Sequence, residues 1–258
     1  MTATEFYALM LTVFAGLATV PGSIFAMFTK KTNTKLLACS LGFSAGVMIY
    51  VSMAELMVKS NDYLIHYHGD FIGNVISVCS FFGGIILIAL IDYFIPSAEG
   101  DIGNTNQTVS LKRMGILTTA AIAIHNFPEG LVTFASTLSD INLGIMIAVA
   151  IAIHNIPEGI ATALPIYFAT GNRKKAFIIS FISGITEPIG AILGYTVMKP
   201  YLNDSIMGIM FAGVAGIMMF ISLEELLPMA REYEKSKITI LSVIAGMAIM
   251  AISLIMFI

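Results

Sequence analysis

The residues best able to do chemistry in this chain stand in a ten-residue phrase that occurs twice. AIAIHNFPEG covers residues 121–130 (the first copy) and AIAIHNIPEG covers residues 150–159 (the second copy), with nine of ten positions identical at an offset of 29 residues. Each copy places an imidazole, an amide and a carboxylate in apolar sequence. On a helix, residues three or four positions apart share a face. The His and Asn of each copy therefore project over the same surface as its Glu.

These residue types favour the binding of divalent metal ions. Imidazole with carboxylate and amide oxygens, and without thiolate, suits Zn²⁺, Fe²⁺, Mn²⁺ and Co²⁺. A carboxylate has two oxygens and can bridge two ions, so the doubled phrase predicts a binuclear site. The predicted metal ligands, six from the two copies and one from the later TEP at 186–188, are His125, Asn126, Glu129, His154, Asn155, Glu158 and Glu187. We expect the two imidazoles at one ion and the amides with Glu187 at the other.

A proline in each copy should bend the helix that carries it. Pro128 and Pro157 lack an N–H and clash with the carbonyl four residues back. In a membrane, the freed carbonyl must be satisfied by protein or by a water-filled cavity. The copies thus predict a bent, roomy part of a helix bundle. A purely structural hydrogen-bonding role is the alternative for each copy, and Glu187 as a protonated acid could bind a freed carbonyl.

The chain that positions these residues has the composition of an integral membrane protein. Of its 258 residues, 57% are hydrophobic and 11% are charged, whereas an ordinary soluble domain is about 25% charged. A spanning helix needs about 20 mostly apolar residues. Such runs predict an all-α protein with eight transmembrane helices in a single domain, residues 1–258. The runs are approximately 5–29, 36–58, 72–95, 114–136, 141–168, 176–198, 205–230 and 238–258.

The basic residues predict the orientation of these spans, because Lys and Arg concentrate in cytoplasmic loops. With the N-terminus outside, 11 of the 13 basic residues fall in inside loops, and only Lys59 and Lys199 fall outside. Both termini are therefore expected to face outward.

Two weaker echoes accompany the doubled phrase. AGVMIYVSMAELM (45–57) and AGIMMFISLEELL (215–227) share six of thirteen positions, and TVP (19–21) is similar to TEP (186–188). Together with the doubled phrase, they pair the second helix with the seventh, the first with the sixth and the fourth with the fifth. The helices of each pair cross the membrane in opposite directions. This is the pattern of an inverted-topology repeat, which is common in transporters with a midplane site.

Four further residues could lie on an ion pathway: Glu55, Glu225, His66 and His68. The two histidines belong to HYHGD (66–70), in the predicted outside loop after the second helix. They could capture incoming ions, and an ordinary solvated loop is the other interpretation. Glu55 and Glu225 are repeat partners near the outer and inner membrane surfaces. Both a carboxylate at each mouth of a pathway and a simple interfacial role fit them.

At these residues the sequence resembles the ZIP (Zrt-, Irt-like protein) family of divalent metal transporters. HNFPEG, HNIPEG and TEP resemble its ZupT-like bacterial branch in particular, and the likeness extends over the whole chain. It implies a 3+2+3 helix arrangement with inverted halves, outward termini, and uptake into the cytoplasm, often as a homodimer. Carried over to this sequence, it assigns one transport site to His125, Glu129, His154 and Glu158. The second site would use Asn126, Asn155 and Glu187 with the two shared glutamates.

The predicted function is therefore secondary transport of divalent metal ions through the cytoplasmic membrane into the cell. Zinc is the first choice of ion, followed by iron, manganese, cobalt and cadmium. A metal-ion channel of the same fold is the alternative. An intramembrane metal-dependent hydrolase is disfavoured, because no separate base or nucleophile stands out. The expected partners are the ions, the lipid bilayer and a second copy of the chain, with no prosthetic group and no nucleic acid.

Overall fold

The computed structural model describes residues 2–28, 33–94, 107–198, 201, 203–234 and 237–256. Within these ranges the chain is helical and forms no β-strand, which confirms the all-α prediction for the described part. Seven of its helical segments are long and apolar enough to cross a membrane, namely Ala3–Phe28, Thr34–His68, Asp70–Tyr93, Gly144–Thr170, Arg173–Val197, Asp204–Tyr233 and Lys237–Ile255. The eighth span, expected at 114–136, lies within the 33-residue helix α6 (Gln107–Ser139) and stays a prediction.

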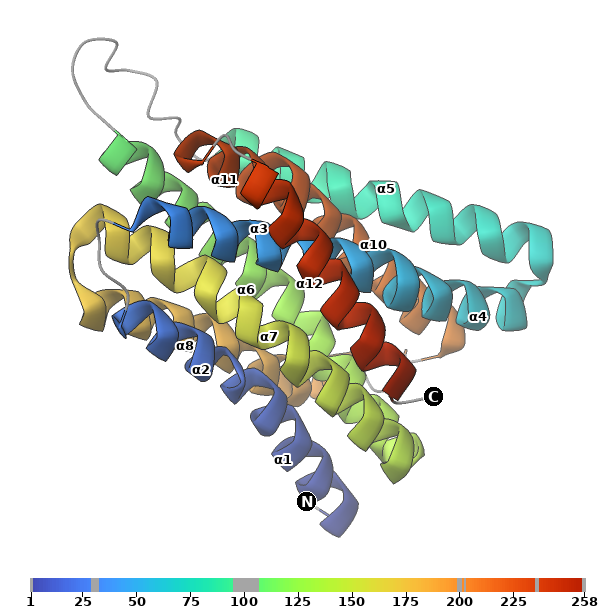
Figure 1. Ribbon diagram of the computed structural model, residues 1–258. Coiled ribbons are helices and arrows are strands. Elements are labelled where there is room, and N and C mark those ends of the chain that lie inside the picture. Colours follow the sequence, from blue (N-terminus) through green and yellow to red (C-terminus); the bar gives the residue numbers. More distant parts are fainter. Residues whose placement is uncertain are drawn as a thin grey trace.

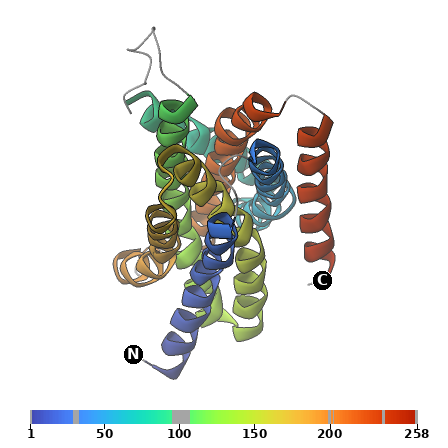
Figure 2. The same ribbon diagram turned by 60° about the vertical axis from the view of Figure 1, so that its left-hand side comes forward.

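One group of helices surrounds the doubled phrase, and we call it the site bundle. It contains α6, α7 (Ile141–Thr170), and the pair α1 (Ala3–Leu17) and α2 (Thr19–Phe28), which follow one another with a break at Ala18. Its last rod is α8 (Arg173–Ile189), continued by the π-helical turn η3 (Gly190–Gly194) and α9 (Tyr195–Met198). α6 and α7 pack along each other, and both contact α1 and α8. Figure 2 shows this group beside the remaining helices.

The other helices form a flanking bundle. One long rod is built from α3 (Thr34–Val51), the π-helical turn η1 (Ser52–Leu56) and α4 (Met57–His68), and it is followed by α5 (Asp70–Phe94). A second rod is built from α10 (Asp204–Phe220), the π-helical turn η4 (Ile221–Leu226) and α11 (Leu227–Tyr233), and it is followed by α12 (Lys237–Met256). α3 packs on α12, and α10 packs on α5 and α4 (Figure 1). The two bundles meet where α3 contacts α7 and α10 contacts α6.

Short polar signals start and stop these apolar helices. Thr2 and Glu5 form a reciprocal capping box at the start of α1. Asn33, Asn172 and Asn203 each accept a hydrogen bond from the backbone N–H three residues on, which caps α3, α8 and α10. Such side chains satisfy backbone donors that a helix start leaves open. Gly69, with φ of 82°, forms the tight turn between α4 and α5, a conformation that glycine adopts without strain.

The rod formed by α3, η1 and α4 is longer than its apolar run predicts. The sequence places its end near residue 58, but helix continues to His68. The prediction that His66 and His68 lie in a loop is therefore wrong, because both stand in the last turn of α4. Polar residues can extend a helix beyond the hydrocarbon region, where water solvates their side chains, so the apolar run marks the span and not the end of the helix.

The two rods of the flanking bundle share local features at equivalent places. Ser52 donates to the carbonyl of Met48, and Ser222 donates to that of Met218, both at 2.7 Å. Each bond stands where the α-helix passes into a π-helical turn, as expected where a side chain competes for the backbone ladder. The partner helices approach equally closely. A Cβ added at Gly46 would lie 2.0 Å from the Val243 oxygen, and one at Gly216 would lie 2.0 Å from the Phe81 oxygen.

These approaches predict that Gly46→Ala and Gly216→Ala each lower the free energy of unfolding by about 1–3 kcal/mol, because the helices must separate to admit a methyl group. The measurement is thermal unfolding of the purified protein in detergent. Gly83→Ala is the matched control, since a Cβ there meets nothing within 4 Å. Equal losses in all three variants would contradict the packing argument.

Candidate metal centre

The two copies of the phrase bring their amides and carboxylates to the interior of the site bundle. Asn126 and Glu129 belong to α6, Asn155 and Glu158 belong to α7, and Glu187 comes from α8. Four of these five side chains are 0% exposed and Glu129 is 3% exposed. The backbones of His125 and His154 lie in α6 and α7, but their imidazoles lie outside the side chains that the structure describes.

Each asparagine is held by a backbone carbonyl from another helix. The Nδ2 of Asn126 donates to the Ser183 oxygen at 3.2 Å, and the Nδ2 of Asn155 donates to the Ala15 oxygen at 2.8 Å. Asn155 also donates to Oε1 of Glu187. With their NH₂ groups engaged in this way, the two amides present oxygen to the bundle interior. In the described part of the chain, neither Oδ1 atom nor Oε2 of Glu187 has a hydrogen-bond partner.

The three carboxyl groups lie close enough to interact. Glu129 and Glu158 both act electrostatically on Glu187. Ionised carboxylates that share an apolar region repel each other, and a cation between them removes that repulsion. Together with the two amide oxygens, they form a set of oxygen donors that suits a divalent cation. Among the described side chains, no three His, Cys, Asp or Glu residues form a compact ready-made metal cluster, so any ion must draw also on amides or on groups outside the description.

Glycines let the helix backbones around this region nearly touch. A Cβ added at Gly130 would lie 1.9 Å from the Glu187 oxygen, and one at Gly159 would lie 2.1 Å from the Thr19 oxygen. The last residue of each copy is thus the point where α6 meets α8 and α7 meets α2. Close approach through small residues is how helices associate where lipid supplies no hydrophobic drive. It also brings the backbone carbonyls of α1 and α8 within reach of the asparagines.

These contacts come in matched pairs. Gly190 meets the Phe127 oxygen as Gly22 meets the Ile156 oxygen, and Gly16 and Gly184 meet each other's oxygens. Each of these glycine contacts of the first copy with α8 or η3 therefore has a counterpart between the second copy and α1 or α2, at a spacing of 168 residues. The TVP and TEP likeness pairs the segments at 167 residues, one position away. The glycine contacts therefore define which residues of the two repeats correspond, and the prolines do not. At this spacing of 168 residues, the counterpart of Glu187 is Thr19.

Comparison with known proteins identifies the family. A sequence model of the family described as ZIP Zinc transporter matches residues 96–254. The chain belongs to the ZIP family. It is 53% identical over 259 residues to the zinc transporter ZupT of Lysinibacillus sphaericus, with 96% of each chain covered. It is 52% identical over 267 residues to the zinc transporter ZupT of Chlorobium chlorochromatii, with 100% of each chain covered. Membership of the ZIP family makes the chain a transporter and not an enzyme.

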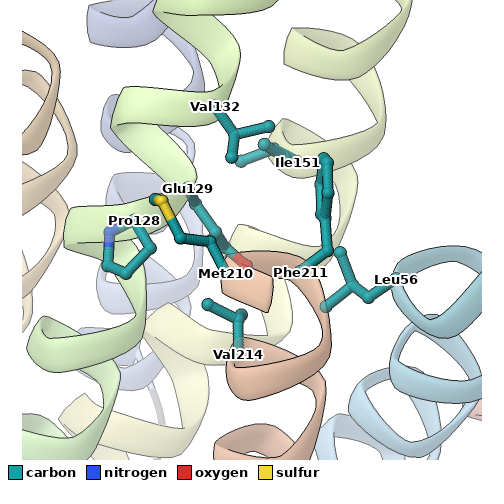
Figure 3. A pocket seen from close by; sticks show the side chains of 8 residues that line it. All are labelled: Leu56, Pro128, Glu129, Val132, Ile151, Met210, Phe211 and Val214. Carbon is teal, nitrogen blue, oxygen red and sulfur yellow. The ribbon is translucent and has the colours of Figure 1, made fainter. Parts of the chain in front are cut away.

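A small apolar cavity of about 20 Å³ borders Glu129 in this ZIP protein. It lies where the site bundle meets the flanking bundle (Figure 3), and its lining residues come from η1, α6, α7 and α10. They are Leu56, Pro128, Glu129, Val132, Ile151, Met210, Phe211 and Val214. The first copy therefore has a small space beside its proline, and the predicted bend of the helix there stays a prediction.

The four residues predicted for an ion pathway lie outside the cluster of buried donors. Glu55 is half-buried in η1 and pairs with Lys59 at 3.0 Å, and Glu225 is half-buried in η4. His66 Nδ1 lies 3.0 Å from Asp204 Oδ2, and His68 Nε2 lies 2.7 Å from Ser205 Oγ. The two imidazoles thus link the end of α4 to the first turn of α10. Roles of these four residues in an ion pathway stay predictions.

Sequence reasoning missed the hydroxyl groups that support the ZIP site. Ser44 Oγ donates to the Pro157 oxygen at 2.8 Å, and Ser180 Oγ donates to the Gly159 oxygen at 3.3 Å. Both side chains are fully buried. A serine inside an apolar run is a weak signal, because most such hydroxyls bond only to their own helix.

The difference in asparagine contacts predicts a difference in stability. Asn155→Leu should lower the free energy of unfolding more than Asn126→Leu, because it also removes the hydrogen bond to the buried carboxyl group of Glu187, at a cost of about 1–3 kcal/mol. Thermal unfolding of both variants in detergent gives the comparison. An equal or smaller loss for Asn155→Leu would show that its contact with Glu187 adds nothing to the fold.

Proposed function

We propose that this protein is a secondary transporter that carries zinc, and other divalent ions such as Fe²⁺, Mn²⁺, Co²⁺ and Cd²⁺, across the cytoplasmic membrane into the cell. The observation that carries the proposal is the burial of Glu129, Glu158 and Glu187 together inside an apolar helix bundle. An ionisable side chain in a membrane costs from about 2.5 kcal/mol upward, so it marks a pathway for ions or protons. The similarity to zinc transporters of other bacteria supports zinc as the ion.

The proposed site holds two ions. His125 and His154 would bind one, and Asn126, Asn155 and Glu187 would bind the other, with Glu129 and Glu158 shared. Support comes from the amides, whose Oδ1 atoms accept no hydrogen bond in the described chain while their NH₂ groups are engaged elsewhere. An amide held in this way offers oxygen and not nitrogen, which is what a divalent cation needs.

The proposed mechanism is alternating access by an inverted repeat. The matched glycine contacts of the site bundle and the two π-helical turns of the flanking bundle support it. Both ends of the described chain lie toward the same end of the helices (Figures 1 and 2), which supports an even number of crossings and termini on one side. An inverted repeat can exchange the conformations of its halves, and that exchange opens the same site to each side in turn.

Removing a shared carboxylate should abolish transport. Glu129→Ala and Glu158→Ala are each expected to lower the initial rate of radioactive zinc uptake into proteoliposomes about tenfold or more, because each deletes a ligand of both ions. Glu232→Ala, which removes an exposed carboxylate in α11, is the control and should keep the wild-type rate. Undiminished uptake in both site variants would refute the ligand assignment.

The carrier mechanism predicts that zinc influx saturates with zinc concentration, because each ion must wait for a conformational change. Initial rates over a range of zinc concentrations test this in the same proteoliposomes, with Cd²⁺, Mn²⁺ and Fe²⁺ as competitors. Flux that rises linearly without saturating would instead favour the metal-ion channel.

A further inference from the structure

The two copies of the phrase are held differently by the rest of the protein, although their sequences and glycine contacts match. At three places the matched pattern is broken. In each of them the second copy gains a hydrogen bond whose counterpart is missing from the first copy. The three places are the end of the phrase, its proline and its asparagine.

The first break is a cluster of hydroxyl groups at the end of the second copy. Ser23 and Thr162 each lie 2.7 Å from Ser180 Oγ, and Ser180 lies 3.3 Å from the Gly159 oxygen. Ser180 can therefore accept up to two hydrogen bonds and donate a third. Ser23 and Thr162 also lie 3.0 Å and 3.1 Å from the Thr19 and Glu158 oxygens of their own helices, so each shares its one proton between two helices. All three side chains are 0% exposed. The cluster ties α2, α7 and α8 together at the residue that follows Glu158.

The counterparts of these residues form no such cluster at the first copy. At the offset of 29 residues between the copies, the counterpart of Thr162 is Thr133. At the spacing of 168 residues, the counterpart of Ser180 is Thr12 and that of Ser23 is Ala191. Thr12 donates to the Ala8 oxygen of its own helix, and Ala191 has no hydroxyl. The buried Oγ1 of Thr133 has no hydrogen-bond partner in the part of the chain described. Among the side chains that the structure describes, the counterparts at the first copy therefore form no such tie between helices.

The second break is at the prolines. Ser44 of α3 donates to the Pro157 oxygen across the boundary between the two bundles, at 2.8 Å. Its counterpart in α10, at the spacing of the flanking repeat, is Val214. Val214 cannot donate, and it lines the cavity beside Pro128 (Figure 3). The flanking bundle is thus bonded to the second copy and leaves space at the first.

The third break is at the asparagines. Asn155 bonds to Glu187 as well as to the Ala15 oxygen. The residue that stands for Glu187 on the opposite side is Thr19, whose hydroxyl donates to the Gly16 oxygen of its own chain segment. Asn126 accordingly keeps only its bond to Ser183 among the side-chain bonds described. All three differences act in the same direction.

We propose that Ser44, Thr162 and Ser180 are positioning residues that fix the second copy, residues 155–159, as the rigid half of the metal site. The first copy, residues 126–130, is then the half that is held less firmly, with a small cavity beside it. Segments with fewer buried hydrogen bonds open at lower free energy. The consequence for transport rests on the proposed function, but the difference in rigidity does not.

Hydrogen–deuterium exchange of the full chain in lipid nanodiscs tests the rigidity. Backbone amides of residues 126–133 should exchange about tenfold faster than their counterparts at 155–162. The comparison is internal, since the two segments are identical at five of eight positions and differ only in apolar side chains. Equal exchange, or faster exchange in the second copy, would overturn the proposal even if the protein transports zinc.

Substitution of the cluster tests its effect on the site. Ser180→Ala should raise the KM for zinc uptake about tenfold with little change in the maximal rate, because it disturbs the backbone that carries Glu158 without removing a ligand. It should also speed exchange at 155–162 and leave 126–133 unchanged. Thr12→Ala, at the counterpart position, is the matched control and should alter neither quantity.

Rescue separates positioning from a general loss of fold. Ser180→Cys keeps a donor at this position and should restore part of the wild-type KM, whereas a fold defect would lower the amount of active protein and hence the maximal rate. An unchanged KM in Ser180→Ala, or an equal rise in Thr12→Ala, would refute the positioning role. Absence of zinc uptake by the wild type would refute the proposed function and leave the exchange comparison as the test of rigidity.

Discussion

The structure depends on one constraint, the need to keep several carboxylates and amides buried inside a protein that is otherwise apolar. Water cannot solvate these groups, and each unsatisfied polar atom in such surroundings is costly. The protein meets this constraint by packing α6, α7 and α8 together and by giving Glu187 a hydrogen bond from Asn155. The other helices of the site bundle, α1 and α2, pack against these three.

Glycines make the arrangement possible because they allow backbone to approach backbone. Gly130 and Gly159 bring α8 and α2 so near to the doubled phrase that carbonyl oxygens become acceptors for its asparagines. An asparagine whose NH₂ is held in this way has its oxygen left for an ion. Packing and chemistry therefore follow from the same residues, since the small side chain that closes the helix contact also orients the ligand.

The departures from matched packing give the two halves of the site different neighbours. Hydroxyl groups of Ser44 and Ser180 bond to the backbone of the second copy, whereas Val214 and a small cavity adjoin the first. Near-identical phrases thus stand in unlike surroundings. Metal ligands gain precision from the groups that hold them, and a transporter also requires part of its site to yield. The second copy thus has hydrogen-bonding neighbours where the first has an apolar side chain and a small space.

The sequence by itself determined the class of the protein, most of its spans and the residues that would be buried together. Composition and run length report the transfer of side chains to lipid, and the His, Asn and Glu of the doubled phrase stand out against that background. Tertiary structure decided the register of α1 against α8, the helical setting of His66 and His68, and the partners of Ser44 and Ser180. These depend on which atoms of distant segments come within 3 Å or so of one another. A sequence pattern gives the period of one helix, but contacts between helices are set by packing of all of them at once.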